Sequence, residues 1–391
     1  MDNVSKILDI CTGCSACAQI CPVNAIDIVE NREGFLEPKI NSKCIGCGIC
    51  LKKCPLIKKK LKVNQNINLA YAIQNKNEVI RENSSSGGVF FELATYFINR
   101  GGVVFGATIN KKGYVYHKQI ENINDIKILM GSKYVQSDMG DCFKKCEDLL
   151  SQQKLVLFTG TPCQINGLKA YLKYDYDNLY TQDIICHGVP SPKIWRYYLE
   201  YVTKDNINNL SINFRKKNTG WNNFSLYIKN ENEIIINESM QNNLYLKIFL
   251  KNLILRNSCY ECHFKNNNRD SDFILADFWG AELICKKSGK DDKGTSLLIL
   301  RSNKAKSIFN QIKNNFNYEQ VNYKSALNYN KAFSCSVTKP NSREEVFKKI
   351  EDPELFNLLN KLTKESLNKK VYYFFRKKAS NLKKSLCRGE K

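Results

Sequence analysis

Eight cysteines near the N-terminus stand in two copies of one pattern. The chain reads Cys11-Thr-Gly-Cys14-Ser-Ala-Cys17-Ala-Gln-Ile-Cys21-Pro22 and later Cys44-Ile-Gly-Cys47-Gly-Ile-Cys50-Leu-Lys-Lys-Cys54-Pro55. In this spacing, one loop supplies three thiolates to a [4Fe–4S] cube, and the cysteine before proline ligates the other cube. We therefore expect two [4Fe–4S] clusters, one held by Cys11, Cys14, Cys17 and Cys54 and the other by Cys44, Cys47, Cys50 and Cys21.

Zinc is the alternative metal for closely spaced cysteines. A structural zinc ion takes four ligands, which sequences usually supply as two pairs. Triplets followed by a Cys-Pro ligand fit iron–sulfur clusters better. Cytosolic redox buffers keep disulfides rare, so 17 cysteines in a chain of 391 residues favour reduced thiols that bind metal.

Four further cysteines form a candidate third site. Cys163 lies in Thr-Gly-Thr-Pro-Cys-Gln and Cys186 in Asp-Ile-Ile-Cys-His-Gly, whereas Cys259 and Cys262 form a C-x2-C pair. Cys163 and Cys186 follow predicted strands, and open α/β sheets collect their ligands at the carboxyl ends of strands. The spacing alone gives equal weight to the alternative, in which Cys163 and Cys186 are buried structural thiols.

Five cysteines stay outside these sets. Cys142 and Cys146 are one helical turn apart, a spacing that arises readily by chance. Cys285, Cys335 and Cys387 have no partner pattern. The sequence assigns none of the five a role.

Two polar loops have the composition of a phosphate site. In Ser84-Ser-Ser-Gly-Gly-Val-Phe90, hydroxyl and N–H groups precede a predicted helix, where phosphate commonly binds, although a serine-rich helix cap explains the same residues. Gly131-Ser-Lys-Tyr-Val-Gln-Ser137 adds a cation and an aromatic ring. The candidate cofactor-binding residues are Ser86, Gly87, Gly88, Gly131, Ser132, Lys133 and Tyr134.

The composition predicts a packed protein without a membrane span. The apolar fraction is 43%, and the formal net charge of +22 comes from lysines spread along the whole chain, so it does not by itself indicate nucleic acid. The sequence contains no stretch of eighteen uncharged apolar residues. Because the start of the chain lacks the features of a secretory signal, we expect a cytoplasmic protein.

Strand-like and helix-like runs alternate along the chain, which is typical of an α/β layer fold. Strands are expected at 25–29, 35–40, 69–74, 103–109, 114–120, 154–158 and 179–186, and helices at 85–99, 141–153, from 163, and at 192–203. Antiparallel strands follow at 211–214, 225–229 and 233–237, then a helix at 244–256, strands within 271–301 and helices within 342–388.

Five motifs in order resemble the beta subunit family of coenzyme F420 hydrogenases and dehydrogenases. They are Ser-Ser-Ser-Gly-Gly-Val-Phe, Gly-Ser-Lys-Tyr-Val-Gln-Ser, Phe-Thr-Gly-Thr-Pro-Cys-Gln, Asp-Ile-Ile-Cys-His-Gly-Val-Pro-Ser-Pro and Ala-Asp-Phe-Trp-Gly. With the N-terminal cysteines, the resemblance covers roughly residues 1–285. The basic segment after Lys339 falls outside it.

The resemblance implies a domain order and further cofactors. We expect a ferredoxin-type domain with two [4Fe–4S] clusters over 1–60, a linker over 61–68, an α/β flavin domain with an antiparallel sheet region over 69–338, and a basic helical segment over 339–391. FAD would bind the α/β domain, with a third [4Fe–4S] cluster on Cys163, Cys186, Cys259 and Cys262. Lys133 and His187 are the candidates for flavin electrostatics or proton delivery.

Two functions follow from these expectations. One is an iron–sulfur flavoprotein oxidoreductase that passes electrons between ferredoxin, or a deazaflavin such as coenzyme F420, and an organic substrate. The other is a non-catalytic electron-transfer subunit that links ferredoxin to a partner oxidoreductase. We expect no nucleic-acid partner, whereas the aromatic and basic residues at 369–384 would suit a helix at a membrane surface.

Overall fold

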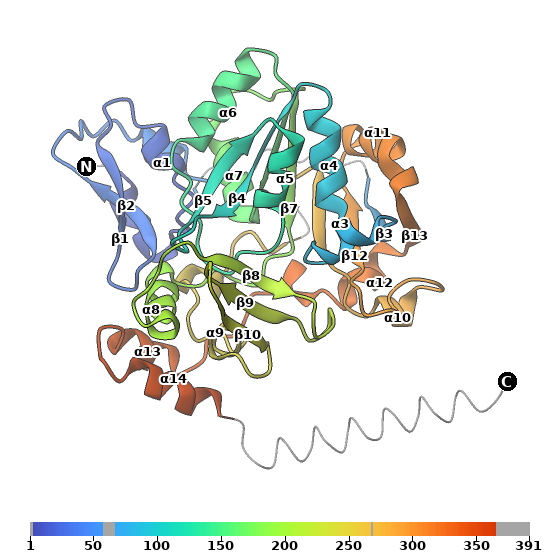
Figure 1. Ribbon diagram of the computed structural model, residues 1–391. Helices are drawn as coiled ribbons and strands as arrows, with labels where there is room; N and C mark the ends of the chain where they lie inside the picture. Colours follow the sequence, from blue (N-terminus) through green and yellow to red (C-terminus); the bar gives the residue numbers. More distant parts are fainter. Residues whose placement is uncertain (1–2, 58–66, 267–268, 365–391) are drawn as a thin grey trace. The chain divides into compact units, whose positions relative to one another are not determined.

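The computed structural model describes residues 3–57, 67–266 and 269–364. Its chain divides into two compact units, Met1–Pro340 and Asn341–Lys391, which are described separately. The first unit contains sheets of two, three and eight strands (Figure 1). The mixed α/β architecture and the N-terminal ferredoxin-like domain that the sequence predicted are confirmed.

The two cysteine repeats fold alike. Each contains a pair of residues with positive φ: Gly13 at 68° and Ser15 at 63° in the first repeat, and Gly46 at 69° and Gly48 at 70° in the second. Glycine adopts this backbone without a steric cost, and it occupies three of the four positions. The elements are η1 (Val4–Ile10), α1 (Ala16–Gln19), β1 (Ile26–Glu30), β2 (Leu36–Ile40) and α2 (Ile49–Lys52).

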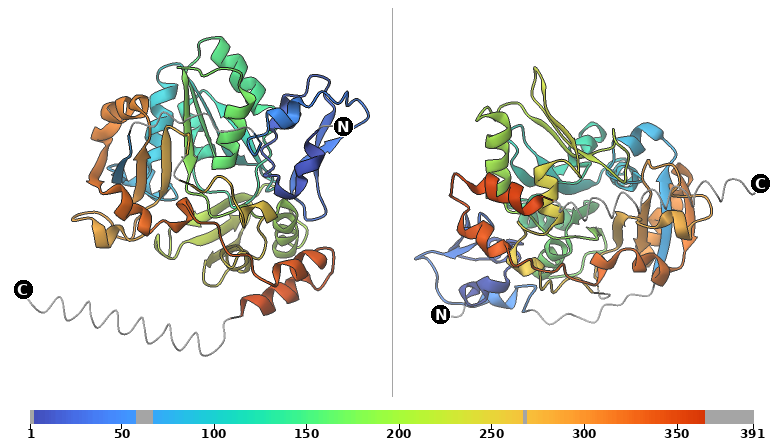
Figure 2. Two further views of the ribbon diagram at one scale, coloured as in Figure 1. Left: turned by 180° about the vertical axis from the view of Figure 1, so that it is seen from behind. Right: turned by 90° about the horizontal axis from the view of Figure 1, so that it is seen from below.

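Strands β1 and β2 pair antiparallel, with Ile26 opposite Ile40. Figures 1 and 2 show this N-terminal segment beside β5, α6 and α7, on the other side of the large sheet from α11 and β13. The loop that carries the first cysteines therefore lies next to one end of the large sheet.

The large sheet has the order β13-β3-β12-β11-β7-β6-β4-β5. Neighbours β4, β6, β7 and β11 are parallel, so their carboxyl ends lie at one edge, whereas the flanking strands are antiparallel. The strands are β3 (Leu69–Asn75), β4 (Val103–Ile109), β5 (Val115–Ile120), β6 (Val156–Gly160), β7 (Leu179–Ile184), β11 (Phe273–Asp277), β12 (Ser296–Leu300) and β13 (Phe316–Val321).

Helices cover both faces of this sheet. Successive strand residues point to opposite faces, so Val104 packs under α4, α5 and α11, while Val103 and Phe105 pack under α6 and α7. These helices are α3 (Glu78–Glu82), α4 (Val89–Ile98), α5 (Ile126–Leu129), α6 (Cys142–Ser151), α7 (Pro162–Tyr171), α10 (Ala281–Ile284), α11 (Asn303–Ile312) and α12 (Tyr323–Asn328). The short 3-10 helices are η2 (Ile123–Asp125), η3 (Asn257–Cys259), η4 (Lys313–Asn315) and η5 (Lys331–Phe333).

An antiparallel sheet and two helices form an aromatic layer below the large sheet in Figure 1. The elements are α8 (Pro192–Thr203), β8 (Ser211–Lys216), β9 (Ser225–Lys229), β10 (Ile234–Ser239) and α9 (Leu244–Leu250). The Trp195 ring lies 4.7 Å from both the Phe214 and Tyr245 rings, and its Nε1 donates to Gly113 O at 2.8 Å. The predicted antiparallel region is confirmed.

Two predicted helices differ in length from the observed ones. The helix expected from Ser85 begins at Val89, because Gly88 adopts a left-handed backbone with φ of 85° and the serines before it form a loop. The helix expected over 244–256 ends at Leu250, because Asn252 turns left-handed and Leu255 pairs with Pro190 in an extended segment. The local apolar pattern did not indicate either loop.

The second unit contains α13 (Arg343–Lys348) and α14 (Leu355–Thr363). Both helices fall within the predicted helical C-terminus. The predicted membrane-surface helix at 369–384 and Cys387 lie outside the described residues.

The aromatic layer predicts an asymmetric response to substitution along α8. Trp195→Ala removes a side chain that is 2% exposed, together with its hydrogen bond to Gly113, so we expect the free energy of unfolding to fall by about 3–5 kcal/mol. Tyr201→Ala changes a residue of the same helix that is 56% exposed and should cost about 0.5 kcal/mol or less. Denaturant unfolding measures both, and equal losses would contradict the packing described.

Candidate functional site

The first predicted quartet lines one cavity. Cys11, Cys14, Cys17 and Cys54 face it together with Val4, Pro38 and Pro55. Burial raises the pKa of the Cys17 thiol, and repulsion from Cys11 and Cys54 raises it further, so these thiols are close neighbours. The N–H of Gly13 donates to Cys11 Sγ at 3.3 Å.

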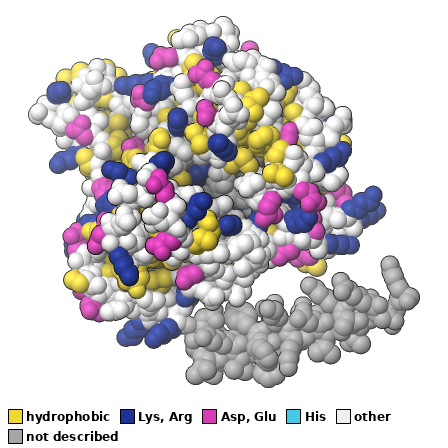
Figure 3. Space-filling view, in the orientation of Figure 1, with side chains coloured by type: hydrophobic (Ala, Val, Ile, Leu, Met, Phe, Trp, Pro, Cys, Tyr) yellow, Lys and Arg dark blue, Asp and Glu magenta, His cyan; other side chains and the backbone are white. Residues whose placement is uncertain are grey.

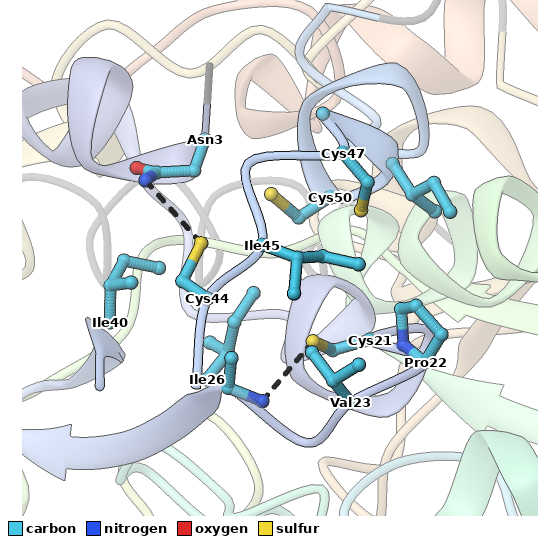
Figure 4. A pocket seen from close by; sticks show the side chains of 13 residues that line it. Asn3, Cys21, Pro22, Val23, Ile26, Ile40, Cys44, Ile45, Cys47 and Cys50 are labelled. Atoms are coloured by element: carbon cyan, nitrogen blue, oxygen red, sulfur yellow. Dashed lines mark hydrogen bonds between the residues drawn. The ribbon is translucent and has the colours of Figure 1, made fainter. Parts of the chain in front are cut away.

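The second predicted quartet lines another cavity, shown in Figure 4. The sulfur atoms of Cys21, Cys44, Cys47 and Cys50 surround a common space among isoleucine side chains. Ala25 N donates to Cys21 Sγ at 3.2 Å, and Asn3 Nδ2 lies 3.9 Å from Cys44 Sγ. Cys47 is exposed to solvent, unlike the other members of both quartets.

Both cavities suit [4Fe–4S] cubes rather than single ions. In each cavity four cysteines from two chain segments face one space, and N–H groups point at the sulfur atoms, as in cluster sites. A cube binds each thiolate through a different iron, whereas one zinc ion needs all its sulfur ligands at about 2.3 Å. Among the described residues, no group of His, Cys, Asp or Glu is placed to hold a single ion.

The structure also brings together the four cysteines of the third predicted quartet. Cys163 lies at the start of α7, Cys186 just after β7, and Cys259 at the end of η3. Burial raises the pKa of Cys163 to about 12, with repulsion from Cys262 and Cys259 among the causes. Burial likewise raises the pKa of Cys186, and the other three thiols of the quartet add to this. Three distant segments thus place four half-buried thiols in one group.

Two buried cations lie beside the third quartet. Lys265 is 7% exposed, and its Nζ donates to His187 O at 2.9 Å. Arg256 is 5% exposed and lies in the turn that leads to Cys259, whose N–H donates to Arg256 O at 2.9 Å. The Thr161 hydroxyl lies 3.1 Å from Cys163 Sγ. These groups provide the positive charge and hydrogen bonding that a cluster with four thiolates requires.

The first and third quartets are direct neighbours. Arg256 Nε and Ser258 Oγ both donate to Cys11 O, at 2.7 and 2.9 Å. On the other side, a Cβ added to Gly167 would lie 2.9 Å from Cys14 Cβ, so Cys14 packs directly on α7. Gly167 is one helical turn from Cys163.

The two candidate phosphate loops contact each other. Ser132 N donates to Ser85 Oγ at 2.7 Å, and the two hydroxyl oxygens lie 3.0 Å apart. Gly87 N donates to Ser296 Oγ at 2.8 Å, and a Cβ on Gly87 would lie 2.2 Å from Ile73 O. The predicted residues Ser86, Gly87, Gly88, Gly131 and Ser132 therefore belong to one loop pair at the carboxyl edge of the large sheet.

Lys133 and Tyr134 have other partners than the sequence suggested. Lys133 Nζ donates to the carbonyls of Ile128, Leu129 and Met130 at 2.8 to 3.2 Å, which caps the end of α5. Burial lowers the pKa of Lys133 to about 7. The Tyr134 ring stacks on Phe249 at 4.5 Å, so it forms part of the aromatic layer.

His187 lies between the third quartet and that aromatic layer. Its Nε2 is 2.7 Å from Asn252 Oδ1, and its ring meets the Phe249 ring edge-on at 5.1 Å. Burial lowers the pKa of His187. Phe249 therefore contacts both His187 and Tyr134, which connects the third quartet with the Gly131–Ser137 loop.

Sequence reasoning missed two cations of this region. Lys217 Nζ donates to the carbonyls of Arg81, Ser86 and Lys293 at 2.6 to 2.8 Å, and burial lowers its pKa to about 8. Arg215 forms an ion pair with Asp277. Neither residue stands out in a sequence rich in lysine and arginine, although Asp277, the partner of Arg215, belongs to the Asp-Phe-Trp-Gly motif.

Of the remaining cysteines that the structure describes, none joins a quartet. Cys142 and Cys146 are buried in the core under α6, and Cys142 Sγ lies 3.6 Å from His117 O. Cys285 is buried against α10 and Cys335 is exposed.

The surface provides no single basic face in the orientation of Figure 3. Lys and Arg side chains are scattered there among acidic ones, while hydrophobic side chains gather over α3, α4 and α5. Of the helices that the structure describes, none has the length and apolar character needed to cross a bilayer.

His117 predicts a pH dependence of stability. It is 6% exposed, its Nε2 lies 3.1 Å from Thr159 O and its Nδ1 2.9 Å from Ser137 Oγ, and burial lowers its pKa to about 4. The unfolded chain, with a histidine pKa near 6.5, binds more protons below that pH, so stability falls on acidification. Between pH 7.5 and 5.5 this histidine should account for about 1.3 kcal/mol of lost stability.

Denaturant unfolding at the two pH values tests this prediction. His117→Gln should be less stable than the parent at pH 7.5 but should lose less stability on acidification. An identical pH dependence in parent and variant would contradict the buried neutral imidazole.

Comparisons with known proteins agree with these sites. Residues 153–325 match the family described as the C terminus of the coenzyme F420 hydrogenase/dehydrogenase beta subunit, and residues 10–76 match the 4Fe-4S dicluster domain. No curated protein sequence matches the chain.

Among solved structures, a chain from the F420-reducing [NiFe] hydrogenase complex of Methanosarcina barkeri is similar, with 14% identity and a TM-score of 0.46. The match covers 70% of this chain and 92% of that one, and at this score it carries no conclusion about function. The two matched ranges contain the cysteines of the three predicted quartets. The chain is therefore an iron–sulfur electron-transfer protein related to the coenzyme F420 hydrogenase/dehydrogenase beta subunit, with the similarity to that family over residues 153–325 and to 4Fe-4S dicluster domains over residues 10–76.

Proposed function

We propose that the chain is a flavin-dependent iron–sulfur oxidoreductase. Electrons from ferredoxin, another low-potential donor or a deazaflavin such as coenzyme F420 would pass through three [4Fe–4S] clusters and FAD to an organic substrate. The observation that supports this proposal most strongly is the group of four half-buried thiols, Cys163, Cys186, Cys259 and Cys262, beside Cys11. Without this third group, electrons from the two N-terminal clusters would have no further cluster to enter in the α/β domain.

The positions of the quartets favour one order of electron transfer. The second quartet includes the exposed Cys47, and the neighbouring Ile45 is 66% exposed, so an external donor has access there. The first quartet lies next to the third. Arg256 and Ser258, just before Cys259, donate to Cys11 O. Gly167, one turn after Cys163, packs against Cys14. Because electron transfer requires close approach, these contacts favour the order second, first, third.

The loop pair supports FAD binding at the carboxyl edge of the sheet. Its hydroxyl and N–H groups precede α4, a helix of ten residues whose N-terminus favours phosphate. Lys217 adds a buried positive charge at Ser86 O, 2.8 Å from its Nζ. A bound flavin would convert hydride transfer into single-electron steps. Gln136, in the same loop as Ser132, bonds Leu36 N at 2.9 Å and so joins this region to the dicluster domain.

The runner-up is a non-catalytic subunit that passes electrons to a partner enzyme. It needs the clusters but no flavin and no substrate pocket. Substrate turnover by the purified chain alone with a reduced donor would favour the enzyme. Cluster reduction without turnover or flavin would favour the electron-transfer role.

Metal and flavin analysis tests the proposed cofactors. After purification and reconstitution without oxygen, the parent should contain about twelve irons and one FAD. Cys262→Ser should contain about eight irons, whereas Cys335→Ser, which alters an exposed cysteine outside the quartets, should keep about twelve. Eight irons in the parent and no flavin would refute the three-cluster flavoenzyme.

Ser85 provides a separate test of the flavin loop. Ser85→Ala removes the hydroxyl that holds the Gly131–Ser137 loop through Ser132. Because FAD would then have to order the loop pair itself, its binding should weaken about five- to tenfold, the equivalent of about one hydrogen bond. Ser84→Ala is the matched control, because the Ser84 hydroxyl bonds Ile80 O of the preceding helix. Fluorescence titration of the flavin-free protein measures both affinities. Equal affinities in both variants would exclude this loop from the flavin site.

A further inference from the structure

Lys265 reaches from one ligand segment of the third quartet to another. Its backbone N–H lies 3.4 Å from Cys262 O, and its Nζ donates to the carbonyl of His187, the residue after Cys186. The side chain is 7% exposed, so its charge is removed from most of the solvent. A buried lysine is costly unless negative charge lies nearby.

The electrostatic partners of this lysine are the quartet thiols. Lys265 attracts negative charge on the Cys186 and Cys259 thiols, and its ammonium group is bound to the residue that follows Cys186. Lys265 is therefore the cation on the Cys186 side of the third quartet, whereas Arg256 lies between the first and third quartets.

A fixed positive charge changes the equilibrium for adding an electron. Reduction adds one negative charge to a cluster and its thiolates, so a cation nearby stabilises the reduced form more than the oxidised form. The effect is larger in a protein interior than in water, because less solvent screens the charges. Charge and hydrogen bonding around the sulfur atoms are general determinants of cluster potentials.

We propose that Lys265 raises the reduction potential of the third cluster and thereby directs electrons inward from the first cluster. This inference rests on the proposed function, because it requires a cluster on the third quartet. One electron leaves the first cluster and enters the third, and no bond is made or broken. Lys265 acts as a positioning charge and does not contact substrate.

The test compares the protein with two variants of Lys265. Lys265→Met removes the charge and keeps most of the side-chain volume, whereas Lys265→Arg keeps the charge. Redox titration without oxygen, followed by electron paramagnetic resonance, gives the potential of each cluster. The signal of the third cluster is the one that Cys262→Ser removes.

Lys265→Met should make reduction of the third cluster about tenfold less favourable, a shift of about 59 mV to lower potential. Lys265→Arg should stay near the parent value, and the signals of the other two clusters should not move in either variant. An unchanged third potential in Lys265→Met, with about twelve irons present, would overturn the inference and leave the proposed function intact.

The parent protein provides a second test if Lys265→Met does not assemble its third cluster. The third potential should then be the highest of the three, and a third potential below that of the dicluster domain would overturn the inference. Absence of any signal that depends on Cys262 would instead refute the proposed function, and the inference with it.

Discussion

Arg256 holds the dicluster domain against the large sheet. Its guanidinium donates to Cys11 O at 2.7 Å and to Leu36 O at 3.0 Å, and its backbone N–H donates to Val189 O at 2.9 Å. Hydrogen bonds from a charged donor contribute about 1.5–3 kcal/mol each, and a buried guanidinium that lost them would be strongly unfavourable. This one side chain therefore contacts the first cysteine loop and β2 of the dicluster domain while its backbone is bonded to the segment that follows Cys186.

The parallel strands of the large sheet determine where two thiols of the third quartet lie. Since β6 and β7 are parallel neighbours, Cys163 and Cys186, which follow them, emerge at the same edge. Cys14 packs directly on α7 because residue 167 of that helix is glycine. Any larger residue at position 167 would clash with the Cys14 side chain. A ferredoxin-like unit is thus placed beside the group of thiols at the strand ends, and the Lys265 ammonium group is bound to the residue that follows Cys186.

The sequence predicted what depends on local spacing. The C-x2-C-x2-C triplets determine both N-terminal quartets, because each loop has to wrap one cube, and apolar alternation located most strands within two residues. Strand ends also indicated Cys163 and Cys186. That these residues are ligands, and that the domain boundaries lie at 60 and 338, stays a prediction.

Long-range contacts explain what the sequence could not provide. Arg256 and Gln136 contact Cys11 and Leu36 across about a hundred residues or more, and no periodic pattern marks such pairs. Lys133 had the composition of a phosphate ligand, yet its ammonium group satisfies the last carbonyls of α5. Lys265 was indistinguishable from the many other lysines until its burial and its neighbours were known.

Anomalous diffraction at the iron absorption edge would test the central claim most directly. Crystals grown without oxygen should contain three separate iron clusters, one inside each cysteine quartet, with the first between the second and the third. Iron in only the two N-terminal quartets, with protein atoms alone among Cys163, Cys186, Cys259 and Cys262, would contradict the account.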